Sequence, residues 1–149
     1  MRNEIQSAIK GLTKLENVLQ EVNNLLNEIR KQSTEKRIGY VAGIITSDGK
    51  EHMQRNIDIL EKHTEKIKKQ YGFPIFSAVD IFGNGVYQKL DDFNQEERLR
   101  EKSFIEFWRK ILSSGHVTNI FMTPRWKESK GATDEHETAK KLGIKIHYI

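Results

Sequence analysis

Four short runs rich in β-branched and aromatic residues alternate with segments of helical spacing, and this alternation constrains the fold more than any other feature. The runs cover residues 38–45, 73–79, 117–122 and 144–149. Between them, apolar side chains recur every three or four positions over residues 52–70, 95–113 and 136–142. Strands and helices that alternate at these lengths predict βαβ units with right-handed crossovers and a parallel sheet.

One connection departs from this rhythm. Residues 80–93 contain Gly83, Asn84 and Gly85 and lack a clear apolar period, so we expect a long loop between the second strand and the helix over residues 95–113. Long loops inside compact domains are usually functional or mobile.

Residues 2–32 predict one long amphipathic helix, because apolar residues recur at an alternating spacing of three and four. The seam consists of Ile5, Ala8, Leu12, Leu15, Leu19, Val22, Leu26 and Ile29. Ile9, Val18 and Leu25 widen this stripe beyond a two-stranded seam, and Gly11 lowers the helix propensity by roughly 1 kcal/mol. Two interpretations stay open: an intermolecular coiled coil or bundle, or a helix that covers its own domain.

The size of the chain suits a single domain. With 149 residues and 36% hydrophobic content, it can bury one proper core. We therefore expect an N-terminal helix for oligomerisation or packing over residues 1–37 and an α/β domain over residues 38–149.

Composition narrows the class of protein further. The 25 basic and 21 acidic residues are interspersed and give a net charge of +4, which favours a mixed solvated surface over nucleic-acid binding. No cysteine is present, which excludes disulfides and thiolate chemistry. No stretch approaches the roughly 18 apolar residues of a membrane span, and the N-terminus lacks the apolar run of a signal peptide. We expect a cytoplasmic protein without membrane association.

The most informative short segment is residues 129–135, between the third strand and the last helix. In open parallel sheets the carboxyl ends of the strands face the ligand crevice, and the following helix offers free N–H groups to an anion. Ser129 and Gly131 suit anion recognition through a hydroxyl and close backbone approach, although an ordinary loop is the alternative. Glu135 is expected in the first turn of the helix, where the dipole would lower its pKa. It would then be a site carboxylate or a capping group, with Asp134 and Glu137 as competitors.

Other parts of the chain offer weaker signals. The loop over residues 43–49 is a second phosphate or sugar cradle, but it lacks the GxGxxG and Walker patterns. Trp126, beside the 129–135 segment, either lines a pocket or belongs to an ordinary loop, whereas Trp108 lies on an apolar helix face and is expected in the core. The five histidines show no metal-ligand spacing, and neither HExxH nor GxSxG occurs. We expect no metal and no cofactor.

Together these features resemble the nucleoside 2-deoxyribosyltransferase-like superfamily, which includes the deoxynucleoside 5′-monophosphate N-glycosidases. Residues 40–43, from Tyr40 to Gly43, look like the first strand of the family, which ends in a glycine at the sugar and phosphate loop. Residues 117–122, followed by Pro124, Trp126 and Ser129, are similar to the strand and loop of uncharacterised members.

The last helix carries the rest of the resemblance. Gly131, Glu135 and Ala139 match the glycine, catalytic glutamate and helix alanine of the family in spacing. Ser129 falls where the monophosphate-specific branch has a phosphate-binding serine. The similarity covers residues 38–149 and leaves out the N-terminal helix.

The resemblance implies an α/β three-layer sandwich with a parallel, flavodoxin- or Rossmann-like sheet. It implies that Glu135 attacks the anomeric carbon of a nucleoside or nucleotide, or stabilises its oxocarbenium-like transition state, while the base departs. The implied binding residues are Tyr40, Gly43, Ser47, Gly49, Ser129, Gly131 and Trp126. Family members usually complete the site with a neighbouring subunit, so we expect a homo-oligomer formed through the N-terminal helix and the α/β domain.

Two departures from the family pattern affect the expected chemistry. Trp108, one turn before Leu112, stands where members commonly carry an aspartate. Glu106, Asp91 and Asp92 are candidates for the missing acid, although none has the family's spacing. The aspartates of the transferase loop are replaced by residues 125–128. These departures favour hydrolysis of a nucleoside 5′-monophosphate over transfer. The alternatives are a catalytically impaired oligomer that binds, sequesters or senses a nucleotide, and a coiled-coil assembly protein with an α/β scaffold.

Overall fold

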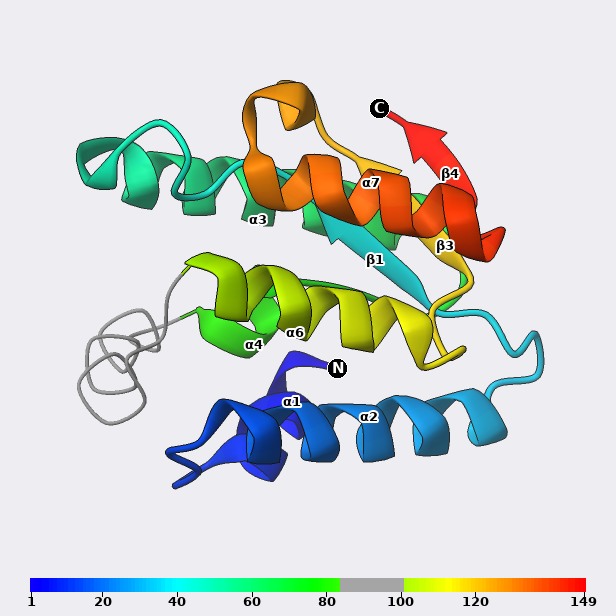
Figure 1. Ribbon diagram of the computed structural model, residues 1–149. Coiled ribbons are helices and arrows are strands. Elements are labelled where there is room, and N and C mark those ends of the chain that lie inside the picture. Colours follow the sequence, from blue (N-terminus) through cyan, green and yellow to red (C-terminus); the bar gives the residue numbers. More distant parts are fainter. Residues whose placement is uncertain (84–100) are drawn as a thin grey trace.

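The four expected strands form one parallel sheet. The computed structural model describes residues 1–83 and 101–149 (Figure 1). Its strands are β1 (Gly39–Ala42), β2 (Ile75–Ser77), β3 (Asn119–Met122) and β4 (Lys145–Tyr148). They lie in the order β2-β1-β3-β4, and every neighbouring pair is parallel. The α/β class is confirmed, and each strand is shorter than its apolar run in the sequence.

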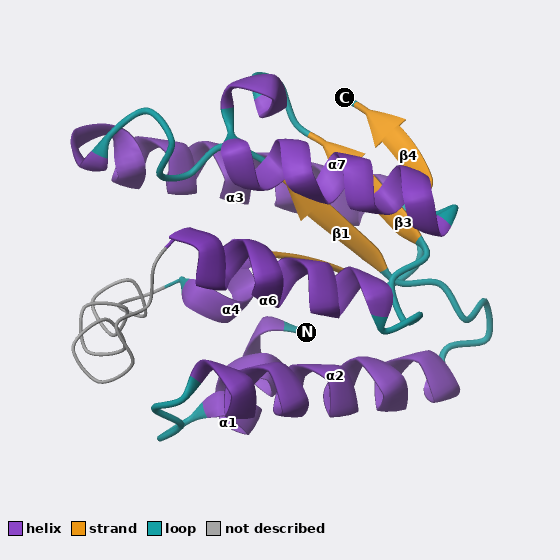
Figure 2. Cartoon of the chain, in the orientation of Figure 1, coloured by secondary structure: helices purple, strands orange, loops and turns teal. Residues whose placement is uncertain are grey.

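Helices lie on both sides of this sheet (Figure 2). On one face α3 (Met53–Gln70) packs through Ile57, Leu60 and Ile67 in a cluster that includes Val41. Tyr40 belongs to the cluster on the opposite face, with α6 (Glu101–Ser113) and α7 (Lys130–Leu142). Successive strand residues point to opposite faces of the sheet, so the side chains of β1 are divided between the two layers.

The second strand is followed by a helix rather than by the expected loop. The short helix α4 (Ala78–Phe82) begins directly after β2, and all five of its residues are buried. Oδ2 of Asp80 accepts a hydrogen bond from the N–H of Ser77 at 2.8 Å, which satisfies a donor at the start of the helix. The remainder of the expected loop, residues 84–93, and the first part of the expected helix, residues 95–100, lie outside the described residues.

The N-terminal segment is two helices, so the prediction of one long helix is wrong. Helix α1 (Arg2–Ile9) and helix α2 (Leu15–Gln32) are separated at Gly11, whose φ is +78°. That left-handed conformation is compatible with glycine and not with a continuing right-handed helix. The break lets the two helices pack against each other and against the domain.

The apolar stripe of these two helices is buried within the chain. Its buried members share one cluster with the inner residues of the sheet and are Ile5, Ile9, Leu15, Val18, Val22 and Leu26. Leu12, Leu19, Leu25 and Ile29 are partly buried against the same cluster. The stripe therefore covers its own domain, which is one of the two interpretations that the sequence left open.

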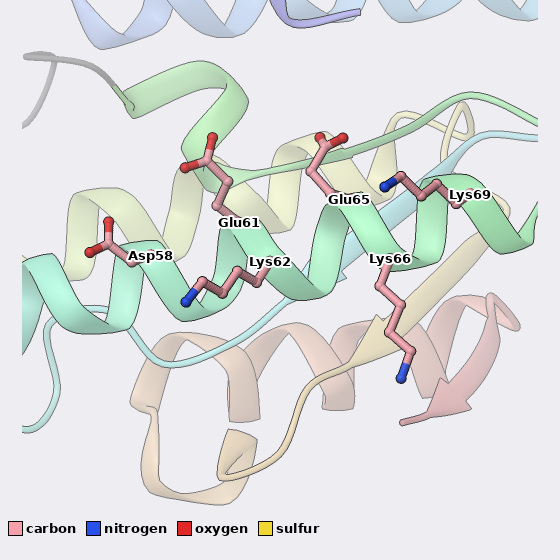
Figure 3. A pocket seen from close by; sticks show the side chains of 6 residues that line it. All are labelled: Asp58, Glu61, Lys62, Glu65, Lys66 and Lys69. Carbon is pink, nitrogen blue, oxygen red and sulfur yellow. The ribbon is translucent and has the colours of Figure 1, made fainter.

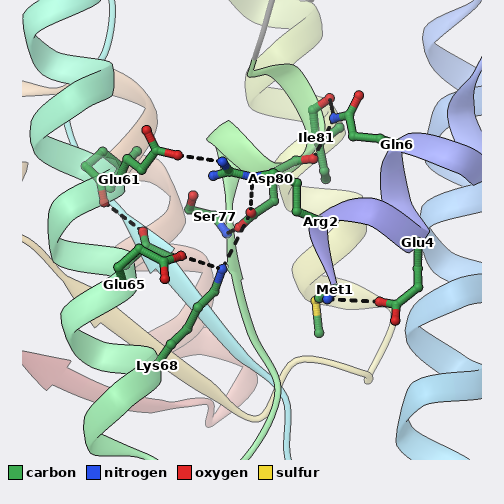
Figure 4. Close-up of polar contacts among 12 residues, drawn as sticks. Met1, Arg2, Glu4, Gln6, Glu61, Glu65, Lys68, Ser77, Asp80 and Ile81 are labelled. Carbon is green, nitrogen blue, oxygen red and sulfur yellow. Dashed lines mark hydrogen bonds and ion pairs between the residues drawn. The ribbon is translucent and has the colours of Figure 1, made fainter.

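Polar and charged side chains of α1 bind it to α4 and α3 (Figure 4). Nε of Arg2 donates to Oδ1 of the fully buried Asp80 at 2.8 Å, and Arg2 also pairs with Glu61 of α3. The Gln6 amide donates to the backbone carbonyls of Asp80 and Ile81 at 2.7 and 3.1 Å. The buried carboxylate thus pairs with Arg2 of α1 and, at 3.6 Å, with Lys68 of α3, as a charge in the interior requires.

Within residues 1–83 and 101–149, no helix combines the length and the apolar character that crossing a membrane requires.

Candidate functional site

The strand order reverses between β1 and β3, which is where a ligand crevice is expected in an open parallel sheet. From β1 the chain crosses by α3 to β2 on one side, and from β2 it returns by way of α6 to β3 on the other side of β1. Ligands of open α/β sheets bind at the carboxyl ends of the strands where the strand order reverses in this way. The segments that follow these two strands, residues 43–49 and 123–129, therefore form the candidate site.

Glu135 lies deeper in α7 than the sequence indicated. The helix begins at Lys130, with Ser129 as its N-cap, so Glu135 falls in the second turn and not in the first. It shares one buried face with Ala132, His136 and Ala139. This i, i+3, i+4, i+7 pattern turns Glu135 toward the sheet, and its exposed fraction is 5%.

The partner of Glu135 is Tyr40 of β1. The Tyr40 hydroxyl donates a hydrogen bond to Oε1 of Glu135 at 3.1 Å, and both groups are buried. The Tyr40 ring stacks on Trp108 with centroids 4.8 Å apart. Trp108 is buried, which confirms the expected core position. Tyr40 therefore contacts the Glu135 carboxyl group directly, a role that the sequence alone did not reveal.

Burial reverses the expected effect on Glu135. Desolvation raises the pKa of its carboxyl group from the ordinary 4.5 to about 8, and Asp134 adds to the rise, while the Tyr40 hydrogen bond acts in the opposite direction. The expected lowering by the helix dipole is wrong, because that effect is confined to the first turn. At neutral pH the carboxyl group is mainly protonated.

Two serines satisfy the N–H groups at the start of α7. Ser129 Oγ accepts from the N–H of Ala132 at 3.1 Å, and Ser47 Oγ accepts from the N–H of Lys130 at 3.2 Å. Asp134 does not cap the helix, because it pairs with Arg109 of α6 through two Nε–H···O contacts of 2.8 and 3.1 Å. The helix start is thus an anion-friendly site whose donors are already bonded to neutral hydroxyls.

The glycines of the candidate site differ in how much space surrounds them. A Cβ on Gly43 would lie 2.4 Å from Oγ1 of Thr123, so packing between the two loops demands glycine there. A Cβ on Gly131 would meet only Ser129 Oγ, at 3.9 Å. Packing within the chain therefore does not explain Gly131. Gly49 closes a turn by donating its N–H to the carbonyl of Thr46 at 3.2 Å.

A polar link that the sequence did not indicate joins the two loops. Asp48 accepts from Nη2 of Arg125 at 3.1 Å and from Nδ2 of Asn56 at 2.6 Å. Arg125 has φ +67° and also pairs with Glu128. A carboxylate after one strand and an arginine after its neighbour were the available signal, because the ends of adjacent parallel strands meet at one edge.

Trp126 lies on the short 3-10 helix η2 (Trp126–Glu128) and is partly buried. It stacks on His136 with centroids 4.3 Å apart, and Nε2 of His136 lies 2.7 Å from the Tyr148 hydroxyl. The Lys127 ammonium lies 5.7 Å from the centre of the Trp126 ring. The ring is therefore engaged by His136 and Lys127, and a base that stacks on it must displace one of them.

None of the suggested replacement acids is shown beside Glu135. Glu106 is 51% exposed and pairs with Lys102 one turn away at 3.9 Å. Asp91 and Asp92 lie outside the described residues. In the described part of the chain, no three histidine, aspartate or glutamate side chains gather as metal ligands would.

A surface depression of about 560 Å³ lies on α3 (Figure 3). Its lining comes from this one helix and consists of Asp58, Glu61, Lys62, Glu65, Lys66 and Lys69. Alternating charges on one exposed helix face are typical of a solvated surface. The depression lies on the α3 layer, on the opposite side of the sheet from Glu135, so it does not belong to the crevice.

Fold and site together define an α/β protein with a buried carboxyl group at a strand-order reversal. A family model described as a domain of unknown function (DUF4406) matches residues 84–148, which include β3, α7 and Glu135. No curated protein and no solved structure matches the chain.

Proposed function

We propose that this protein binds a nucleoside 5′-monophosphate in the β1/β3 crevice and hydrolyses its N-glycosidic bond, with Glu135 as the central residue. The observation that carries the proposal is the buried Tyr40–Glu135 pair, which joins β1 to α7. A buried carboxyl group with a strongly raised pKa in a candidate crevice is a functional-site signal, because burial in this form costs stability. The resemblance to the nucleoside 2-deoxyribosyltransferase-like superfamily, with its flavodoxin- or Rossmann-like sheet, supports the assignment.

The reaction consumes one water and yields a free base and a sugar phosphate. In the ionised form, Glu135 attacks the anomeric carbon or stabilises the oxocarbenium-like transition state as the bond to the base nitrogen breaks. Water then supplies the hydroxyl for the anomeric carbon, and its remaining proton balances the proton taken up by the base. Hydrolysis is favoured over transfer because residues 125–128 replace the aspartates of the transferase loop.

The raised pKa links this role to pH. Since the pKa of Glu135 is about 8, the reactive carboxylate is the minority form at neutral pH and half of the population near pH 8. A nucleophilic or electrostatic role therefore predicts that turnover rises as the pH approaches about 8. A role as general acid predicts the opposite slope, because the protonated form would be the active one.

The binding residues of the proposal lie around the start of α7. Ser129, Ser47 and the N–H groups of residues 130–132 would hold the phosphate, and Gly131 leaves room for its approach. Gly43 and Gly49 would shape the loop beside the sugar, and Trp126 would contact the base. Tyr40 would orient Glu135 rather than bind the phosphate.

The decisive experiment is incubation with a panel of nucleoside 5′-monophosphates between about pH 6 and 9, followed by chromatography of the free base. Glu135→Gln should abolish base release and keep nucleotide binding, since it preserves shape and removes the ionisable group. Glu137→Gln is the matched control, because the Glu137 carboxylate lies on the same helix and is 55% exposed. Undiminished base release by Glu135→Ala would overturn the assignment.

A second candidate function is nucleotide binding without turnover, for sequestration or sensing. Trp108 favours it, because this ring, rather than an acidic side chain, stacks on Tyr40 beside Glu135. When Glu135 acts as the ionised nucleophile, the described part of the chain shows no second acid beside it to give a proton to the departing base. Calorimetry that shows tight binding, with the nucleotide recovered intact at every pH, would support this candidate over hydrolysis. For either function we also propose a homo-oligomer whose subunits contact each other through the α/β domain.

A further inference from the structure

Two contacts join the loop after β1 to the chain after β3. Ser47 Oγ accepts from the N–H of Lys130 at 3.2 Å, and Oδ2 of Asp48 accepts from Nη2 of Arg125 at 3.1 Å. Both acceptors come from the loop after β1, and both donors come from the chain after β3. One movement of residues 46–49 would break the two contacts together.

The Asp48 carboxylate occupies a position rich in donors. Besides Arg125, it accepts from the buried Asn56 amide at 2.6 Å and lies 3.5 Å from Nη2 of Arg55. Three donors around one carboxylate form the kind of cluster that also recognises a phosphate monoester. The carboxylate is therefore held where an anion would be bound.

A buried acceptor next to Asp48 supports a ligand at this position. Nδ2 of Asn56 donates to Asp48 and to the carbonyl of Ile45 at 3.2 Å, which fixes the orientation of the amide. Its Oδ1 is buried and has no hydrogen-bond partner in the described part of the chain. Such an acceptor is costly unless a donor reaches it, and a sugar hydroxyl is a donor that displacement of Asp48 would admit.

We infer that Arg125 is the anion-binding residue at the carboxyl ends of β1 and β3, and that the Asp48 carboxylate lies where the phosphate monoester of a ligand would bind. The identification of that ligand as a nucleotide rests on the proposed function, whereas the anion site itself does not. Displacement of residues 46–49 would take Asp48 away from Arg125, which keeps its pairing with Glu128, and Ser47 away from the N–H of Lys130. A guanidinium and a helix start then face the phosphate from two sides.

The test is binding of inorganic phosphate and of a nucleoside 5′-monophosphate, measured by calorimetry on the full chain. Arg125→Gln should weaken both by about tenfold or more, because a charge-assisted contact is lost. Asp48→Asn should tighten both by roughly threefold to tenfold, since it keeps the shape and removes the competing charge. Arg37→Gln is the matched control, because Arg37 is an exposed arginine paired with Glu35 before β1, and it should change neither affinity.

A nucleoside without a phosphate separates the anion effect from a loss of structure. Its affinity should be unchanged in Arg125→Gln and in Asp48→Asn. Three outcomes would each overturn the inference. They are weaker phosphate binding in Asp48→Asn, unchanged phosphate binding in Arg125→Gln, and no phosphate binding in either the natural chain or Asp48→Asn. Arg125-dependent binding of a nucleotide that is recovered intact refutes the hydrolase and leaves the anion site standing. Cleavage with an unchanged KM in Arg125→Gln would support the hydrolase and refute the anion site.

Discussion

The hydroxyl of Tyr40 donates a hydrogen bond to Oε1 of Glu135 across 3.1 Å, and it joins the first strand to the last helix. The two residues are 95 positions apart in the chain. The contact binds a buried carboxyl group with a raised pKa to a tyrosine that Trp108 holds in place. The stability and the chemistry of this site are therefore coupled to the same ionisation.

The first prediction concerns the pH dependence of stability. In the unfolded chain Glu135 has an ordinary pKa of 4.5, and burial raises the folded value to about 8. The unfolded state therefore loses its proton first, so the free energy of unfolding falls as the pH rises from 4.5 to about 8. The slope from this group is up to about 1.4 kcal/mol per pH unit. Below pH 4.5 its contribution to stability is fully present.

Glu135→Gln should remove this part of the slope, because an amide does not ionise. Urea unfolding of both proteins at about pH 5, 6.5 and 8 measures the difference, and the comparison cancels the other titrating groups. A natural chain and a variant with parallel pH profiles would contradict the raised pKa.

The second prediction concerns Tyr40→Phe. Loss of the hydroxyl removes the hydrogen bond that lowers the pKa of Glu135, so this pKa should rise above about 8. The net loss of stability should be about 1 kcal/mol, and any base release should move to higher pH. Carbon-13 NMR of the glutamate carboxyl groups follows the titration directly. Tyr71→Phe serves as control, since its hydroxyl makes no recorded hydrogen bond to a described residue.

The third prediction concerns the N-terminal helices. Leu26 is fully buried within the chain, so Leu26→Ala should lower the free energy of unfolding by about 2–5 kcal/mol. The partly buried Leu25, mutated to alanine, should cost less than half as much. The loss caused by Leu26→Ala should be the same at low and at high protein concentration, because the stripe packs within its own chain. A strong concentration dependence that Leu26→Ala abolishes would instead indicate an intermolecular seam.

The fourth prediction concerns the break between α1 and α2. Gly11 has φ +78° and open space around its Cα, so Gly11→Ala meets no steric clash and only backbone strain. We expect a loss of about 1 kcal/mol in thermal or urea unfolding. Gly72→Ala is the control, because it is equally unhindered and has no positive φ. Equal effects of the two substitutions would show that the left-handed turn at Gly11 is not required.

The sequence predicted much of the fold because hydrophobic periodicity reports local structure. Strands over residues 38–45, 73–79, 117–122 and 144–149 all appear, in shortened form, and the last helix ends at Leu142 as expected. The prediction of a loop from Asp80 onward was wrong at its first residues, which belong to α4. Its signal was too short to be seen, because five residues do not complete two helical turns.

The N-terminal helix shows where a pattern can mislead. The heptad spacing across Gly11 continued without interruption in the sequence, yet the chain turns there. The turn is stabilised by the packing of α1 and α2 on the rest of the domain. These contacts join residues far apart in the sequence, so local spacing does not predict them.

Residue types and spacing by themselves determined the parallel α/β fold and the importance of the segment from Ser129 to Glu135. Only the tertiary structure decided what surrounds that segment: Tyr40 and the protein interior at Glu135, Ser47 at the helix start, and Asp48 on Arg125. The physical reason is that periodicity is a local property, whereas a pKa and an ion pair depend on burial and on groups distant in sequence. The same glutamate that sequence placed as an ionised helix-end carboxylate is, once enclosed, a carboxylic acid near neutral pH.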